Sequence, residues 1–199
     1  MAKRSGAARS NRIDFAAYFS PATQVPEPPL KEADRKRYDD LGVIGEQELS
    51  AKGYYAGIVR GTRGARAKPA AQSKGAAETT VLVVEDDTGT VEVIERVLEA
   101  AGYNTRAAHN RAQIAEELGR QPRPDVILLD VVLAPGLSGF NVLNKLQQHE
   151  SLRRIPVIML TSMSAGADVV KGLSLGASAY LTKPARPSAL VEAVKAVLA

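Results

Sequence analysis

The chain has 199 residues, with 26 Lys and Arg against 22 Asp and Glu and no cysteine. The lack of cysteine excludes a disulfide framework and a thiolate metal site, and no apolar run approaches the roughly 20 residues that a membrane-spanning helix needs. The basic amino terminus also lacks the apolar core of a signal peptide, so the sequence predicts a cytoplasmic protein.

The excess of positive charge lies at the front of the chain. Residues 1–78 hold fourteen Lys and Arg against nine Asp and Glu, whereas residues 79–199 hold twelve against thirteen. This change in composition predicts two parts, a basic amino-terminal extension at 1–78 and a folded domain at 79–199.

The extension is expected to be largely disordered or weakly helical. Residues 21–29, with four prolines, and residues 60–77, rich in Gly, Ala, Arg and Lys, have the composition of linkers. The pattern at 13–19 is compatible with a short aromatic-faced helix, and 29–59 with two short helical pieces, each too short to be stable alone. Two interpretations stay open: a tail that packs occasionally on its own domain, and a docking segment that folds on a partner.

In the second part, short apolar runs typical of buried strands alternate with helical patterns. The runs lie at 79–84, 104–108, 125–130, 156–161 and 178–182, and the helical patterns at 88–101, 110–119, 139–149, 166–175 and 186–198. Five successive strand–helix units with short connections predict a doubly wound parallel α/β sheet, because right-handed crossovers place helices on both of its faces.

Polar side chains stand where these runs end. Glu85 and Asp86 follow the first run, Asp130 ends the third, Thr161 ends the fourth and Lys183 follows the fifth. Because the carboxyl ends of parallel strands line one edge of a sheet, these residues should meet in one crevice. Crowded carboxylates resist ionising together unless a hard cation neutralises them, and Mg²⁺ prefers carboxylate oxygens with water and phosphate.

A carboxylate beside positive charge can also act as a nucleophile. It can attack phosphorus to form an aspartyl phosphate when donors meet the phosphoryl oxygens, and Lys183 and Thr161 are placed to be those donors. Each residue alone has a simpler explanation: the acidic pair suits a helix N-terminus, Thr161 an N-cap, and Lys183 a solvated loop. Asp130 is harder to explain in that way, since a carboxylate that ends an apolar strand needs a partner.

The stretch 79–199 resembles the receiver domain of two-component response regulators. Glu85 and Asp86 stand where that family's acidic pair binds Mg²⁺, Asp130 where it accepts phosphate, Thr161 at the switch hydroxyl, Tyr180 at the switch aromatic residue, and Lys183 with Pro184 at its Lys-Pro pair. One departure is Gly139, which lies one residue farther from Asp130 than in the commonest family spacing, an insertion that a Pro/Gly turn absorbs easily.

The resemblance implies a flavodoxin-like strand order 2-1-3-4-5, a cis Lys183–Pro184 peptide and the Val132 carbonyl as a further metal ligand. It also implies a phosphoryl donor, which would be a sensor histidine kinase or a phosphotransfer protein, and an inward turn of Tyr180 when Thr161 moves toward the phosphoryl group. The domain would be no conventional enzyme but would promote its own Mg²⁺-dependent phosphotransfer. By the same resemblance Val132 and Met163 flank the path of hydrolytic water, and because neither orients water, autodephosphorylation should be slow.

Output is the part that the sequence specifies least. The last helical pattern ends at 198, so no carboxyl-terminal output domain is expected, and the output is either a downstream protein partner of the receiver surface or the extension. Phosphate contacts from Lys3, Arg4, Arg9, Arg12, Arg60, Arg63, Arg66 and Lys68 would make the extension a nucleic-acid binder, although acidic residues lie between the two groups. A scaffold that is never phosphorylated is disfavoured because the site is complete. His109 and His149 are expected at the surface, with no role in a metal site or a relay.

Overall fold

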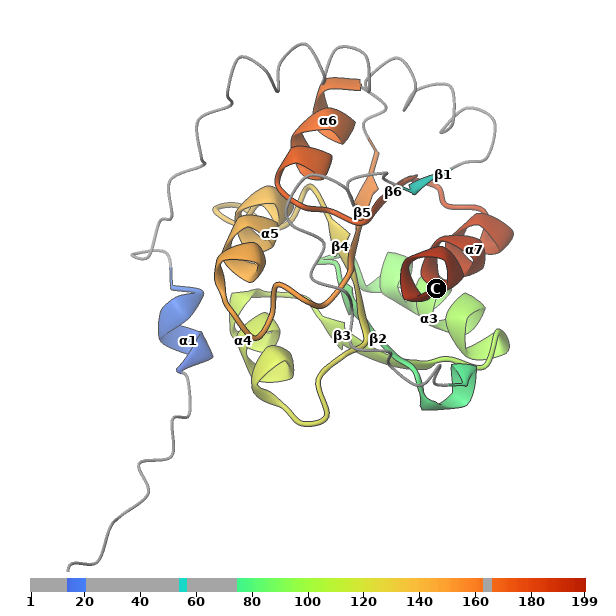
Figure 1. Ribbon diagram of the computed structural model, residues 1–199, viewed down its shortest axis with the longest axis horizontal. Helices are drawn as coiled ribbons and strands as arrows, with labels where there is room; N and C mark the ends of the chain where they lie inside the picture. Colours follow the sequence, from blue (N-terminus) through green and yellow to red (C-terminus); the bar gives the residue numbers. More distant parts are fainter. Residues whose placement is uncertain (1–13, 21–53, 57–74, 163–165) are drawn as a thin grey trace, which may run out of the picture.

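The computed structural model describes residues 14–20, 54–56, 75–162 and 166–199. In them a six-stranded sheet lies between two layers of helices (Figure 1). The strands are β1 (Tyr54–Ala56), β2 (Thr80–Val84), β3 (Asn104–Ala108), β4 (Val126–Asp130), β5 (Val157–Thr161) and β6 (Ala179–Thr182). The helices are α1 (Phe15–Tyr18), α3 (Thr88–Ala100), α4 (Arg111–Gly119), α5 (Gly139–Gln148), α6 (Gly166–Ser174) and α7 (Pro187–Leu198), with a 3-10 turn η2 at Ala76–Glu78. None of the helices described here has the length and apolarity to cross a membrane.

The strand order along the sheet is β1-β6-β5-β4-β2-β3. Strands β2 to β6 pair in parallel, and within them the order is second, first, third, fourth, fifth. This confirms the expected order 2-1-3-4-5 and the doubly wound α/β class.

The core has two halves, one on each face of the sheet. Successive residues of β2 alternate between them: Leu82 and Val84 face the side that packs under α4, α5 and α6, while Val81 and Val83 face α3 and α7. This alternation follows from the two-residue period of a strand, and burial on both faces explains why the central strands are continuous apolar runs. Burying each such side chain stabilises the fold by about 1.5–3 kcal/mol.

In the described residues the extension departs from its expected structure in two places, strand β1 and the η2 turn, whose first two residues, Ala76 and Ala77, lie in the stretch 60–77 expected to be a linker. Residues 54–56 were expected within a helical stretch at 29–59, but they form an antiparallel strand on β6, with Tyr55 opposite Tyr180. The edge of β6 offers unpaired backbone groups, and tyrosines favour strands whereas a helix of a few residues is not stable alone. The rest of 29–59, the linker 21–29, residues 60–74 and the basic residues from Lys3 to Lys68 lie outside the described residues.

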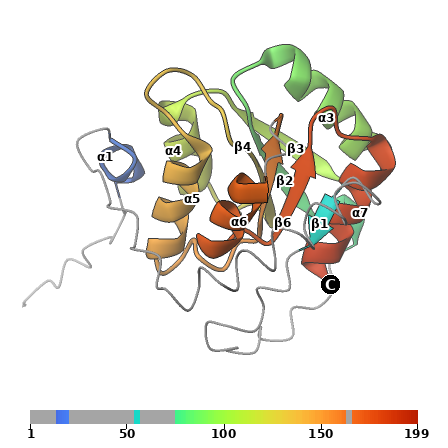
Figure 2. The same ribbon diagram turned by 90° about the horizontal axis from the view of Figure 1, so that it is seen from above.

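Helix α1 confirms the short helix expected within 13–19. Asp14 caps it by accepting a hydrogen bond from the Ala17 N–H at 3.1 Å. Phe15 and Phe19 are buried in the core half beneath α4 and α5, so the helix lies against its own domain (Figures 1 and 2). We call residues 14–20 the α1 segment. Of the two interpretations left open by the sequence, the structure shows the segment packed on its own domain.

His149, expected at the surface, is half-buried, because the α1 segment packs against one side of its ring. The His149 ring centroid lies 5.4 Å from that of Phe15 and 5.3 Å from that of Tyr18. The Ser151 N–H donates to His149 Nδ1 at 3.2 Å, which requires an unprotonated Nδ1. Burial lowers the pKa of His149, and the positive charge of Arg123 lowers it further against a smaller opposing effect of Glu150.

We predict that removing the two rings, in Phe15→Ala/Tyr18→Ala, raises the pKa of His149 toward its ordinary value of 6.5. Because the pKa is lowered in the packed state, neutral His149 favours packing above pH 6.5, and that contribution is lost as the pH falls through the lowered value. The measurement is a proton NMR titration, in which the only other histidine is His109. Val93→Ala, on the opposite face of the domain and exposed, is the control; an unchanged His149 pKa in the double variant would show that the rings do not shield it.

Candidate functional site

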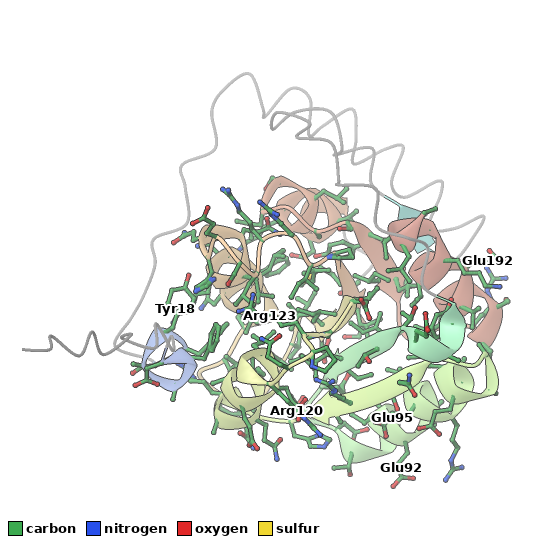
Figure 3. All side chains as sticks on the ribbon, turned by 60° about the horizontal axis from the view of Figure 1, so that its bottom comes forward. Tyr18, Glu92, Glu95, Arg120, Arg123 and Glu192 are labelled. Carbon is green, nitrogen blue, oxygen red and sulfur yellow. The ribbon has the colours of Figure 1, made fainter. Side chains whose placement is uncertain are left out.

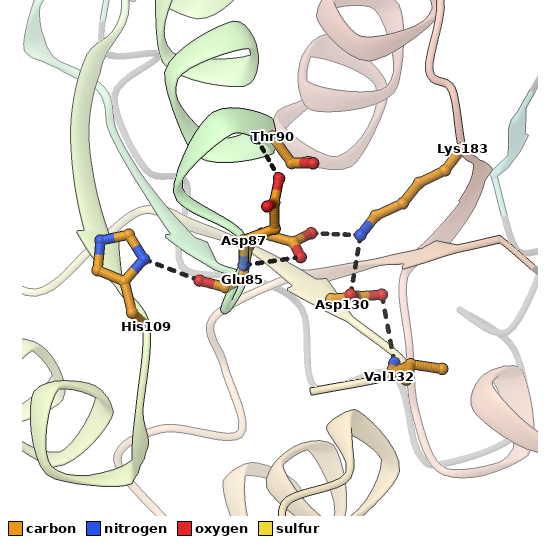
Figure 4. Close-up of polar contacts among 7 residues, drawn as sticks. All are labelled: Glu85, Asp87, Thr90, His109, Asp130, Val132 and Lys183. Atoms are coloured by element: carbon orange, nitrogen blue, oxygen red, sulfur yellow. Dashed lines mark hydrogen bonds and ion pairs between the residues drawn. The ribbon is translucent and has the colours of Figure 1, made fainter. Parts of the chain in front are cut away.

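Four strand ends bring the expected polar residues to one edge of the sheet. Glu85 follows β2, Asp130 ends β4, Thr161 ends β5 and Lys183 follows β6 (Figure 4). Glu85, Asp86 and Asp130 each place one carboxylate oxygen within 4.8 Å of the others. Glu85 and Asp130 are almost fully buried, at 2% and 5% exposure, whereas Asp86 is exposed.

Lys183 joins the two buried carboxylates. Its Nζ donates to Asp130 Oδ2 at 2.8 Å and also to Glu85 Oε2. Its backbone N–H donates to the Thr161 carbonyl at 2.7 Å, which fixes the turn after β6 against the end of β5. The Lys183–Pro184 peptide is cis, as expected. Buried ion pairs of this kind are costly to break, because the remaining charge is left without a partner.

The electrostatics of the pair follow from burial and proximity. Burial raises the pKa of Glu85, the hydrogen bond from Lys183 opposes this, and the charge of Asp130 raises it again. Burial alone would lower the pKa of Lys183, but its hydrogen bonds and charge interactions with Asp130 and Glu85 outweigh that effect and raise it. The ammonium therefore stays charged at neutral pH.

This donor set fits a hard divalent cation. Three carboxyl groups beside one ammonium supply more acidic than basic groups and several oxygen ligands, which is the chemistry that Mg²⁺ selects. Glu85, Asp86 and Asp130 are the residues that would hold it.

The loop after Asp130 is held close to that residue. The Val132 N–H donates to Asp130 Oδ1 at 3.2 Å, and Val132 pairs with Ser138 in an isolated β-bridge. A Cβ added to Gly139 would lie 2.9 Å from the carbonyl carbon of Asp130 and closer still to its oxygen, so only glycine fits there. The extra residue before Gly139 is accommodated in the loop that the Val132–Ser138 bridge closes, and Gly139 still packs against Asp130.

Two residues near the site carry contacts that the sequence did not reveal. Asp87 accepts from the Thr90 N–H at 2.7 Å as the N-cap of α3, and its own N–H donates to Glu85 Oε1 at 3.4 Å. His109 Nδ1 lies 3.0 Å from the Glu85 carbonyl, which can only accept, so Nδ1 carries the proton. His109 is half-buried and, through this contact, holds the backbone next to the site. The Asp before a helical pattern was a visible N-cap signal, but nothing local in the sequence marked the His109 contact.

The two expected switch residues are both buried. Thr161 and Tyr180 have no exposed surface, and the Tyr180 hydroxyl donates to the Asp168 carbonyl at 2.8 Å. Burial raises the pKa of Tyr180, and the charge of Asp168 raises it further. The inward turn expected on phosphorylation is therefore not needed in this conformation, because the ring already lies inside. Met163 lies outside the described residues.

A glycine makes room for the Tyr180 ring. A Cβ on Gly172 of α6 would lie 2.6 Å from the Tyr180 hydroxyl oxygen and 2.8 Å from Cζ, both closer than carbon atoms tolerate. The buried position of Tyr180 thus depends on a missing side chain in the helix that covers it.

We predict that Gly172→Ala destabilises the protein by about 1–3 kcal/mol through overpacking. This exceeds the gain of up to about 1 kcal/mol that alanine brings to a helix. Urea unfolding measures it, with Gly89→Ala in α3 as control, because a Cβ there meets only Asp87 Oδ1 at 3.5 Å. The penalty should disappear in a Tyr180→Ala background, and a penalty of equal size in both backgrounds would rule out the ring as its cause.

Comparison with known proteins agrees with this geometry. The family model of the response regulator receiver domain matches residues 81–195. The phosphate regulon transcriptional regulatory protein PhoB of Pseudomonas aeruginosa is 41% identical over 119 residues, covering 60% of this chain and 51% of PhoB. The DNA-binding response regulator MtrA of Mycobacterium leprae is 37% identical over 118 residues, covering 59% of this chain and 50% of MtrA. The chain thus spans about half the length of these curated relatives.

Solved structures show the same similarity. The signal receiver domain of a signal transduction histidine kinase from Syntrophus aciditrophicus superposes with a TM-score of 0.54 at 36% identity, covering 60% of this chain and 89% of that one. The residues that the family model matches run from β2 to α7.

Proposed function

Because this chain belongs to the response regulator receiver domain family, we propose that it is a phosphorylation-controlled switch that accepts a phosphoryl group on Asp130. The donor would be a phosphohistidine of a sensor histidine kinase or of a phosphotransfer protein. The observation that carries the proposal is the Asp130 carboxylate, which is held between the Lys183 ammonium and the Val132 N–H beside two further carboxylates.

In the proposed reaction an oxygen of Asp130 attacks phosphorus as the bond from phosphorus to the donor histidine nitrogen breaks, and the bonding electrons return to that nitrogen. Mg²⁺ held by Glu85, Asp86 and Asp130, with the Val132 carbonyl as the further expected ligand, would neutralise charge on the phosphoryl oxygens. Lys183 would exchange its contact with Glu85 for one with the phosphoryl group.

The Thr161 hydroxyl would then act as the second donor and move toward the phosphoryl oxygens. A phosphoryl group adds nearly two negative charges, so the donors that surround Asp130 must rearrange. By resemblance to the family, the resulting change of surface would lie on α6, β6 and α7. Tyr180 is already buried beside α6, so its part in that change would be a shift within the core, and the receiver would signal to a downstream protein partner through this surface.

We predict that Asp130→Asn abolishes labelling by acetyl phosphate, since an amide cannot form an acyl phosphate. Intact mass in Mg²⁺ buffer measures the label. The control is Glu92→Gln on the exposed face of α3 (Figure 3), which removes a carboxylate far from the strand ends. Undiminished labelling of the asparagine variant would exclude Asp130 as the acceptor.

We predict that Lys183→Ala separates metal binding from phosphotransfer. Lys183 is a donor and no ligand, so the variant should still bind Mg²⁺ in a titration, while labelling falls by about 100-fold, as expected when one charge-stabilising donor is removed. An equal loss of Mg²⁺ affinity in Lys183→Ala and Asp130→Asn would contradict the separate roles.

We also predict that the phosphorylated protein is long-lived. Val132 is 54% exposed and offers an attacking water no hydrogen bond, and Met163 is the second expected flanking residue. The double variant Val132→Asn/Met163→Glu should hydrolyse roughly 10- to 100-fold faster than wild type. This increase is no larger than the lower end of what a positioned general base supplies. Decay of the phosphoprotein after donor removal measures it, and equal decay of wild type and variant would exclude the apolar flank as the cause of the long lifetime.

A further inference from the structure

The carboxyl end of helix α1 is capped by two cations of the receiver. Lys145 Nζ donates to the carbonyls of Tyr18 and Ser20 at 3.0 and 3.1 Å, and Arg111 Nη1 donates to the carbonyl of Phe19 at 3.1 Å. The last carbonyls of a helix have no partner within the helix, and they favour positive charge. The α1 segment is thus held by its backbone as well as by its buried rings.

This packing buries the positive charge of Lys145, which has no carboxylate among its contacts in the described part of the chain. Lys145 is only 7% exposed, and in the described part of the chain its ammonium bonds to carbonyl oxygens rather than to a carboxylate. Burial lowers the pKa of Lys145, and the charge of Arg111 lowers it further. The cost of desolvating the ammonium and ordering a short segment offsets the burial of Phe15 and Phe19, so the segment is held by a small net free energy.

Arg111 connects the segment to the phosphoacceptor loop. Its Nη2 donates to the Gly136 carbonyl at 2.6 Å, while Nη1 holds Phe19. Gly136 lies in the loop 131–138, whose first turn is fixed by the Val132 N–H bond to Asp130 Oδ1. One guanidinium therefore touches both the loop that begins at Asp130 and the α1 segment.

The loop and the segment also share the core. Leu133 is buried in the same apolar cluster as Phe15 and Phe19, and Leu137 packs against that cluster. Helix α5 provides a second connection. Its first residue, Gly139, lies against the Asp130 carbonyl, and its seventh, Lys145, places its Nζ 5.9 Å from the Phe19 ring centroid.

We propose that the α1 segment is an output element of the switch: phosphorylation of Asp130 shifts loop 131–138 and releases the segment from the surface formed by α4 and α5. This inference rests on the proposed function. A phosphoryl group on the Asp130 carboxylate changes the acceptor of the Val132 N–H, so the loop that Arg111 contacts must adjust. In the unphosphorylated protein the α1 segment packs against loop 131–138. When the loop shifts, the segment loses its connection through Arg111 and its contacts with Leu133 and Leu137.

The test is amide hydrogen exchange of Tyr18, Phe19 and Ser20 in the full chain, with Mg²⁺, before and after addition of acetyl phosphate. These amides donate within residues 14–20, and a helix of this length is protected only while it is packed. Phosphorylation should speed their exchange by about tenfold, within the usual range of coupling between two sites. Arg111→Ala should exchange fast without the donor. The control is Arg120→Ala, which should behave as wild type, because this exposed arginine is the C-cap of α4 and contacts Glu117 (Figure 3).

A reciprocal measurement uses the same samples. If phosphorylation and packing oppose each other, a Phe19→Ala chain should reach a higher phosphorylated fraction than wild type at equal donor concentration. Intact mass of each sample reports the label. A full label with unchanged exchange of residues 18–20 overturns the inference alone, and absence of any label overturns the proposed function together with it.

Discussion

The ion pair of Lys183 with Asp130 and Glu85 is the interaction on which the site depends. The parallel sheet places the ends of β2, β4 and β6 along one edge, and acidic residues at two of these ends would repel each other in a dry environment. The Lys183 ammonium, which follows β6, pairs with both carboxylates and offsets their repulsion. In the strand order 2-1-3-4-5, β4 and β5 lie between the first and last strands of the receiver, and the long side chain of Lys183 reaches across to Glu85 and Asp130.

The sequence predicts those parts of the molecule that follow from local patterns. The five parallel strands appear as apolar runs because they are buried on both faces, and the site residues appear at the ends of these runs because a parallel sheet aligns its carboxyl ends. Strand β1 could not be predicted in this way, since three residues become a strand only through the edge of β6. The position of α1 also depends on a residue far along the chain, because the Tyr18 hydroxyl donates to the Lys145 carbonyl, 127 residues away, at 2.7 Å. Nothing in the sequence of residues 14–20 indicates that partner.

Two glycines decide how closely helices approach the residues that matter. Gly139 lets α5 begin against the backbone of Asp130, and Gly172 lets α6 lie against the Tyr180 ring. In a close-packed interior such contacts leave little room for gradual movement. Under the proposed function, a change at Asp130 would therefore reach the helices as a shift of whole elements. Both glycines are visible in the sequence, but only the structure shows that each one allows a close contact with a neighbouring residue rather than a turn of the chain.

Lys145, which is buried, and Lys183, which is partly buried, have surroundings that differ in a way that bears on their roles. Lys183 faces carboxylates, which raise its pKa, whereas Lys145 faces carbonyl oxygens and a neighbouring arginine, and its pKa is lowered. Removing Lys183 would leave the buried carboxylates of Glu85 and Asp130 without their cation, whereas removing the α1 segment from Lys145 returns its ammonium to water, where a charge is best solvated. Lys183 is therefore part of the site at the strand ends, whereas Lys145 holds the α1 segment, whose release would cost little electrostatic free energy.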